Sequence, residues 1–274
     1  MDTYAVIDFE TTGMTPAQGA RATEIGVVLV QDGRIVDQYA SLMRSDAWIP
    51  PFIEQLTGIS NAMVRSAPAA EQVMHEVSRF TAGCGLVAHN ASFDRHFWLA
   101  ERQWAGCQDD SLESGTGQTT PAFNPYAPRP STADQPASDP AEHVKGPFGA
   151  RTPRRLRPTP EHQPPVFACT LLLARRLYPQ APNHKLGTLA SWHALPDCGR
   201  AHRALADALT TAHLLIRMQH DLRTRLTGEL AGQPLSHALL TRVQRLGKDQ
   251  LARTLLAPSE PPSVSAVPER SDHP

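Results

Sequence analysis

Cysteine is scarce in this chain of 274 residues, and its four cysteines lie far apart, at Cys84, Cys107, Cys169 and Cys198. No two of them form a Cys-x-x-Cys pair, which excludes the usual zinc motifs and a disulfide framework. The chain also lacks an apolar run of the ~18 residues that a membrane-spanning helix needs. No basic segment followed by an apolar one opens the sequence. We therefore expect no signal peptide, and a soluble, cytoplasmic protein without membrane contact.

An excess of basic charge is missing as well. Lysine and arginine total 26 against 27 acidic residues, which gives a formal net charge of -1. Such a chain has no global positive field of the kind that coats many nucleic-acid-binding proteins, so any contact with a nucleic acid must be local. The 41% of apolar residues is enough for a substantial core.

Proline is abundant but unevenly placed, with twelve of the 25 prolines between residues 107 and 165. This stretch has few apolar residues and no periodicity, so it cannot bury enough surface to offset the entropy of ordering. We therefore predict one domain with a disordered insertion, followed by a helical extension and a loose tail. The domain covers 1–106 and 165–225, the insertion 107–164, the extension 226–257 and the tail 258–274. The basic part of the insertion, 145–157, is either a solvated linker or a weak contact to a phosphate backbone.

The hydrophobic pattern predicts an α/β fold in which helices flank a mixed five-stranded sheet. The second and third strands are joined by an Asp32-Gly33 hairpin signal, so the first part of the sheet should be antiparallel. The expected strands are 3–9, 23–31, 34–43, 85–90 and 166–169. The expected helices are 52–56, 69–80, a helix carrying Phe93 to Trp104, 170–177, 185–194, 204–225 and a helical region at 235–256.

The first expected strand ends in two closely spaced carboxylates, Asp8 and Glu10. Side chains alternate along a strand, so both carboxylates point to the same side. Two like charges at this spacing raise each other's pKa. A chain tolerates this where a cation lies between them, or where the strand end is simply solvated. Oxygen ligands of this kind suit Mg²⁺ or Mn²⁺.

Two other polar groups lie where strand ends and helix starts should meet. Asp94 falls in the first turn of a helix, where the macrodipole favours its charge, although an ordinary helix-start aspartate would look the same. His202 and Asp207 are five residues apart, so they would not share a helical face. We therefore place His202 on the loop before the helix, where a solvated loop histidine is the simpler interpretation. His89 could satisfy a buried backbone group as easily as touch a substrate.

Together these segments resemble the DEDDh 3′→5′ exonucleases, and within them the epsilon proofreading subunit of bacterial replicative DNA polymerase. The three motifs of that family are matched by Asp8-x-Glu10-Thr11-Thr12-Gly13, His89-Asn90-x-x-Phe93-Asp94 and His202-x-Ala204-x-x-Asp207. The connecting stretches 56–60 and 168–179 are also similar to the family. The resemblance covers roughly 3–106 and 165–217, and the long insertion departs from the epsilon pattern.

The resemblance implies a ribonuclease H-like fold and a catalytic site. In that site Asp8, Glu10, Asp94 and Asp207 would hold two divalent ions, Mg²⁺ or Mn²⁺. A metal pair ~4 Å apart stabilises the attacking and departing oxygens of an in-line displacement. His202 would be the general base, for which an imidazole pKa near ~6.5 is suitable. The expected reaction releases nucleoside 5′-monophosphates from the single-stranded 3′ end of DNA, with RNA as an alternative substrate.

The resemblance also implies a set of substrate contacts around this site. Thr11 and Thr12 would meet the terminal nucleotide and its 3′-OH, Leu56 and Thr57 would pack its base, and Asn90 and Phe93 would line the path of the strand. Leu56 and Phe93 equally suit a protein core, and Thr11 equally suits a turn.

Other classes of function compete with this interpretation. A haloacid-dehalogenase phosphatase also begins with a strand and Asp-x-Asp-x-Thr, but Glu10 replaces its second aspartate here. A non-catalytic module on the same fold should have lost a carboxylate or the histidine, and this chain has all five residues. The amphipathic region 235–256 could dock on a DNA polymerase subunit or another partner, or it could pack back onto the domain.

Overall fold

The computed structural model describes residues 2–107, 165–247, 250, 251 and 253, which leaves most of the expected insertion and tail outside the described residues. Five strands form one sheet in the order β3-β2-β1-β4-β5. They are β1 (Tyr4–Thr11), β2 (Ala22–Gln31), β3 (Arg34–Leu42), β4 (Gly85–Ala88) and β5 (Ala168–Cys169). The first three strands pair antiparallel, whereas β4 is parallel to both β1 and β5. The expected mixed five-stranded sheet is confirmed.

The β2–β3 hairpin follows the residues of its turn. Asp32 and Gly33 have φ values of 51° and 73°, the left-handed conformation that a tight hairpin turn requires at both positions. The expected strand 85–90 is shorter than predicted and ends at Ala88. The chain turns there because Asn90 also takes a positive φ, 60°, which is incompatible with a strand.

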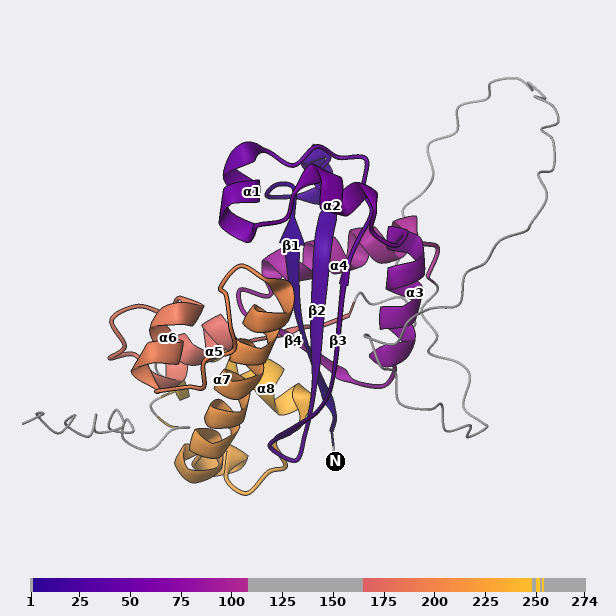
Figure 1. The fold of residues 1–274 in the computed structure, drawn as a ribbon. Helices are drawn as coiled ribbons and strands as arrows, with labels where there is room; N and C mark the ends of the chain where they lie inside the picture. Colours follow the sequence, from indigo (N-terminus) through magenta and orange to yellow (C-terminus); the bar gives the residue numbers. More distant parts are fainter. Residues whose placement is uncertain (1, 108–164, 248–249, 252, 254–274) are drawn as a thin grey trace, which may run out of the picture. The chain divides into compact units, whose positions relative to one another are not determined.

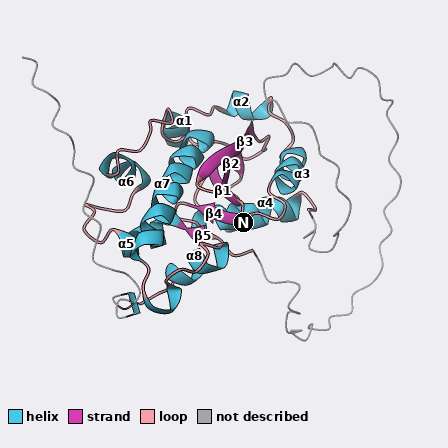
Figure 2. Ribbon diagram, turned by 90° about the horizontal axis from the view of Figure 1, so that it is seen from below, coloured by secondary structure: helices cyan, strands magenta, loops and turns pink. Residues whose placement is uncertain are grey.

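Helices cover both faces of the sheet (Figure 1, Figure 2). One face carries α5 (Thr170–Leu177), α6 (Leu186–Trp192), α7 (Ala204–Arg225) and α8 (His237–Val243), and the other carries α3 (Ala70–Phe80) and α4 (Ser92–Trp104). The alternation of β1 supplies both cores, because Val6 packs on the first side and Ile7 on the second. A smaller apolar cluster includes residues of α1 (Pro51–Thr57) and α2 (Asn61–Arg65). Two 3₁₀ helices complete the described elements, at Pro16–Gln18 and Gly228–Leu230.

The N-terminus of α7 lies directly against the sheet at Gly26 of β2. A Cβ atom at this position would come within 2.4 Å of the Ala204 carbonyl, so only glycine permits the contact. Asp8 and Glu10 share the strand face of Val6, which is the face that α7 covers. The close approach at Gly26 therefore brings the first turns of α7 to the carboxylates of β1.

The helical region expected at 235–256 is interrupted, since α8 ends at Val243. Residues 250 and 251 are again helical, whereas 248, 249, 252 and 254–256 lie outside the described residues. The residue after α8, Gln244, turns its side chain to the edge of the sheet. Its Oε1 accepts a hydrogen bond from the Cys169 N–H at 2.6 Å, and its Nε2 donates to the Phe167 carbonyl at 3.1 Å. The apolar residues of α8, including Leu240, are buried in the core beside α7. The apolar face that could have docked on a partner packs back onto the domain.

Candidate active site

The five residues expected to carry catalysis line one cavity of about 450 Å³. Asp8 and Glu10 lie on β1, Asp94 in the first turn of α4, and Asp207 in the first turn of α7. His202 lies in the loop before α7, as the spacing from Asp207 predicts. Residues separated by nearly two hundred positions therefore meet because two helices begin at the carboxyl end of the same strand.

Asp94 is held in place by the strand that it faces. Only 2% of its surface is exposed, and its Oδ1 accepts a hydrogen bond from the Phe9 N–H at 3.1 Å. The ladder between β1 and β4 ends at the pair Val6 and Val87, so Phe9 lies beyond it. The carboxylate takes the place of the missing strand and fixes the start of α4 against β1.

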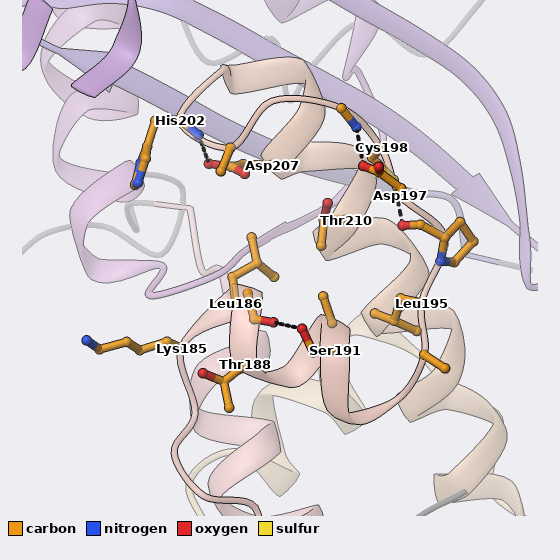
Figure 3. Close-up of a pocket in the computed structure, with 16 residues that line it drawn as sticks. Lys185, Leu186, Thr188, Ser191, Leu195, Asp197, Cys198, His202, Asp207 and Thr210 are labelled. Atoms are coloured by element: carbon orange, nitrogen blue, oxygen red, sulfur yellow. Dashed lines mark hydrogen bonds between the residues drawn. The ribbon is translucent and has the colours of Figure 1, made fainter. Parts of the chain in front are cut away.

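His202 lies at the exposed rim of the cavity. It adopts a left-handed backbone conformation with φ of 60°, and its N–H donates to Oδ2 of Asp207 at 3.1 Å (Figure 3). Glu10, His202 and Asp207 each offer a side-chain ligand atom, and these atoms lie within 4.8 Å of one another. An exposed imidazole beside carboxylates can take a proton from a water molecule in the cavity and release it to solvent.

Burial and mutual repulsion raise the pKa values of the carboxylates. Burial, together with the nearby charges of Asp207 and Glu24, raises the pKa of Glu10 to about 8. Burial also raises the pKa of Asp94 to about 7, and the pKa of Asp8 lies well above its ordinary value for the same reason, reinforced by the neighbouring acids. A cation would relieve this repulsion, and carboxylate oxygens are the donors that Mg²⁺ and Mn²⁺ prefer. The residues present therefore fit a site for divalent ions.

An ion pair beside the cavity, in which the acid is buried and the arginine is partly exposed, was not predicted. Arg203, next to His202, binds Glu24 of β2 through two hydrogen bonds of 3.0 and 2.6 Å. Glu24 also accepts the Ala204 N–H at 3.0 Å, and only 5% of its surface is exposed. Glu24 pairs with Glu10 across the sheet, so the ion pair ties the His202 loop to the carboxylate-bearing part of the sheet. The register of β1 with β2 would have placed Glu24 here, but the sequence does not reveal that Arg203 reaches it.

Most of the residues expected to bind substrate also line this cavity. Thr11, Leu56, Thr57, Asn90 and Phe93 line it, and Leu56 is 49% exposed, which argues against a purely structural role. Thr12 is not among the lining residues. Its Oγ1 accepts the Arg21 N–H at 3.0 Å and its own N–H donates to the Arg21 carbonyl, so its side chain holds the turn after β1.

His89 lines the cavity but both of its ring nitrogens have protein partners. Nδ1 lies 2.9 Å from Oγ1 of Thr170 and Nε2 lies 3.1 Å from the His184 carbonyl. Burial lowers its pKa to about 4, so the ring is neutral at physiological pH. These contacts support the structural interpretation of this histidine.

Two exposed apolar residues at the cavity were missed from the sequence. Met14 is 78% exposed and Phe52 is 68% exposed, and both line the cavity beside Leu56. The available signal was their position, because each lies next to a predicted motif but outside the apolar periodicity of any core-facing element. We call Met14, Phe52 and Leu56 the apolar rim.

Comparison with known proteins finds similarity to exonucleases. Residues 5–103 match the family model described as Exonuclease. The nuclease domain of 3′hExo, described as a DEDDh family member, has the same fold with a TM-score of 0.53 at 18% identity, over 80% of this chain and 92% of that one. The 3′-5′ exonuclease DinG of Bacillus subtilis is 41% identical over 105 residues. These matches support a 3′-5′ exonuclease domain of the DEDDh type in this chain. Asp8 and Glu10, on which the haloacid-dehalogenase alternative rested, lie inside the region that the exonuclease model matches.

Other similar proteins match most of this chain. DinG of Staphylococcus epidermidis is 28% identical over 78% of this chain. The chain spans only 11% and 18% of the lengths of the Bacillus and Staphylococcus proteins. Exonuclease X in complex with 5′ overhanging duplex DNA gives a TM-score of 0.51 at 23% identity, covering 88% of this chain and 99% of that one. Among the residues that the structure describes, no helix is long and apolar enough to cross a membrane.

Proposed function

We propose that this domain hydrolyses phosphodiester bonds from the 3′ end of single-stranded DNA and releases nucleoside 5′-monophosphates. The observation that supports this most is the meeting of four carboxylates and an exposed histidine around one cavity. A module that only binds nucleic acid gains nothing from carboxylates that raise each other's pKa, because they repel phosphate.

In this proposal Asp8, Glu10, Asp94 and Asp207 hold two divalent ions, Mg²⁺ or Mn²⁺. Bound there, such ions stabilise the negative charge on the attacking and departing oxygens of the phosphodiester. His202 takes the proton of the attacking water and passes it to solvent, as its exposed position allows. The hydrogen bond from its N–H to Asp207 keeps the loop beside the carboxylates during this transfer.

The apolar rim receives the base of the terminal nucleotide in the same proposal. Stacking and packing against exposed apolar side chains tolerate any base, as a non-specific exonuclease requires. Thr11 lies at the cavity wall, and its hydroxyl donates to the Gly13 carbonyl at 2.7 Å, so in this proposal it meets the 3′-OH as an acceptor. Asn90 and Phe93, which also line the cavity, would line the strand path. Since the Thr12 side chain is engaged with Arg21, any contact from Thr12 would come from its backbone.

The sugar preference rests on weaker support than the reaction. Exonuclease X is described in complex with 5′ overhanging duplex DNA, and 3′hExo is described as bound to rAMP. We favour DNA because the motifs resemble the proofreading group, and RNA is the alternative. A polymerase partner and a cytoplasmic location stay predictions from the sequence.

A labelled-strand assay tests the proposal. Single-stranded DNA labelled at its 5′ end should shorten progressively with Mg²⁺ or Mn²⁺ and stay intact with a chelator. Duplex DNA and RNA of the same sequence report strand and sugar preference. His202→Ala should lower the rate by ~10²–10⁴ while metal binding is retained. Equal digestion with chelator present, or by the His202→Ala variant, would contradict the proposed mechanism.

A further inference from the structure

A second cavity of about 560 Å³ adjoins the candidate active site. Its wall is shared with the catalytic cavity at His89 and Asn90, and it continues between α5 and the start of α6. The remaining lining residues are Leu171, Arg175, Asn183, His184, Lys185 and Leu186. We call this cavity the α5–α6 groove.

The charge of the α5–α6 groove is opposite to that of the catalytic cavity. Four carboxylates line the catalytic cavity, whereas no carboxylate appears among the described residues that line the groove. Its two charged residues, Arg175 and Lys185, are basic and exposed. Figure 3 shows the Lys185 side chain extending away from the ribbon into the open. A chain with a net charge of -1 therefore concentrates positive charge at a cavity that adjoins its acidic site.

The position of the groove suits the strand that precedes the scissile bond. The apolar rim accounts for one side of the catalytic cavity and would hold the terminal base. The rest of the strand must then leave by another side, and each of its phosphates needs a positive or hydrogen-bonding partner. At the shared wall, Asn90 offers an amide, and the groove beyond adds an amide from Asn183, the two basic groups, and apolar surface from Leu171 and Leu186.

We propose that the α5–α6 groove binds the backbone of the single strand upstream of the scissile phosphate, and that Arg175 and Lys185 contact its phosphates. This inference rests on the proposed exonuclease function, because it takes the strand from the carboxylate site outward. In this proposal the groove contributes to the affinity for the strand, and hydrolysis takes place in the catalytic cavity.

A competing path runs through a third cavity of about 720 Å³, between α6, the 194–203 loop and α7 (Figure 3). That cavity also adjoins the site, through His202 and Asp207, and it shares Lys185 and Leu186 with the α5–α6 groove. Of the two basic residues, only Arg175 belongs to the groove alone. However, the third cavity places a further carboxylate, Asp197, in the wall, which would repel the phosphates of a strand. The electrostatics therefore favour the α5–α6 groove.

Binding measurements test the groove separately from catalysis. The affinity of a fluorescent single-stranded DNA would be measured by anisotropy in an Asp8→Asn background, which prevents digestion. Arg175→Ala and Lys185→Ala should each raise Kd by roughly three- to tenfold, and each should lower the salt dependence of log Kd by about 0.7. Arg79→Ala is the matched control, since it removes an exposed arginine from α3 on the opposite face of the sheet.

Two further readouts separate the outcomes. The p-nitrophenyl ester of thymidine 5′-monophosphate has no upstream strand, so the groove variants should hydrolyse this ester at the rate of the wild type. If neither the wild type nor any variant hydrolyses the ester, that result counts against the proposed function alone. Ser191→Trp, which narrows the cavity of Figure 3, should leave the Kd for DNA unchanged. The groove proposal is overturned if Arg175→Ala and Lys185→Ala bind DNA like Arg79→Ala, or if Ser191→Trp weakens binding as much as they do.

Discussion

At the scale of single residues, the site combines side chains placed by local spacing with an ion pair that joins two distant elements. Strand alternation alone predicts that the side chains of Asp8 and Glu10 point to the same side. The spacing of five residues between His202 and Asp207 predicts that His202 lies in the loop before the helix. The ion pair of Arg203 with Glu24 could not be predicted in this way, because it joins positions that only the finished fold brings together. The same holds for the hydrogen bond that the Thr12 hydroxyl accepts from the Arg21 N–H.

The raised pKa of Glu10 predicts how metal-free stability depends on pH. The folded-state pKa of about 8 lies above the unfolded value of ~4.3, so the protonated group favours the folded state. This contribution is complete below pH ~4 and is lost as the pH rises through about 8. With chelator present, Glu10→Gln should therefore raise the melting temperature at pH 8.5, by about 2–4 °C for each kcal/mol of repulsion that the substitution removes. At pH 5 the melting temperature of the variant should be nearly that of the wild type.

The control for this experiment is saturating Mn²⁺ at the higher pH, where the wild type should become the more stable protein because the variant has lost a ligand. A lower melting temperature for Glu10→Gln without metal at both pH values would show that a protein partner stabilises the carboxylate.

Glu24 is expected to act as a positioning residue for the His202 loop. Glu24→Gln keeps an acceptor for the Ala204 N–H but weakens the pairing with Arg203. We expect kcat to fall by roughly tenfold with little change in KM, as for residues that orient catalytic groups. The matched control is Glu101→Gln, because Glu101 makes a similar buried pair with Arg21 at 2.9 Å but does not contact the loop. If kcat falls equally in both variants, Glu24 only stabilises the fold and does not position the His202 loop.

At the scale of elements, periodicity located the strands and helices but misjudged some of their ends. The region 235–256 has a helical apolar pattern, yet α8 ends at Val243, and the side chain of the next residue, Gln244, pairs with the edge of the sheet. The apolar pattern cannot predict this pairing, because it depends on the polar side chain of Gln244, which hydrogen-bonds the sheet edge as a neighbouring strand would. The turn at Asn90 shortened β4 for a comparable reason, since a positive φ is set by local geometry.

The pairing of Gln244 with the sheet edge should be measurable as stability. Gln244→Ala leaves the Cys169 N–H and the Phe167 carbonyl without this partner, at a cost of about 1–3 kcal/mol. Arg245→Ala, an exposed neighbour on the same turn, should cost less than about 0.5 kcal/mol. Chemical denaturation of both variants checks this. Similar midpoints for the two would mean that water replaces the glutamine at the edge.

At the scale of the whole molecule, composition predicted an insertion at 107–164, nearly all of which lies outside the described residues. The two halves of the exonuclease domain meet without the 108–164 segment, since Arg95 on α4 donates to the Pro165 carbonyl at 3.0 Å and Trp98 packs on Phe167 with ring centroids 6.3 Å apart. Described residues after 225 belong to the same core, among them Leu226 and Leu230. The boundary proposed at 225 therefore separates a helix from residues that it packs against.

Replacing 108–164 with a Gly/Ser linker should leave cooperative unfolding and the hydrolysis of a small phosphodiester unchanged. The reason is that contacts such as Arg95 with Pro165 close the domain without this segment. Thermal unfolding followed by circular dichroism, with turnover of the nitrophenyl ester, measures both properties. A broad or absent transition would show that the segment is part of the fold.

Titration of the metal-free protein with Mn²⁺ by calorimetry tests the central claim most directly, because it asks whether the four carboxylates form one ion site. The account predicts about two ions bound per chain, in line with a two-metal phosphodiesterase site, and a loss of this binding in Asp8→Asn and Asp207→Asn. Mn²⁺ binding by the wild type that is no stronger than binding by these variants would contradict it.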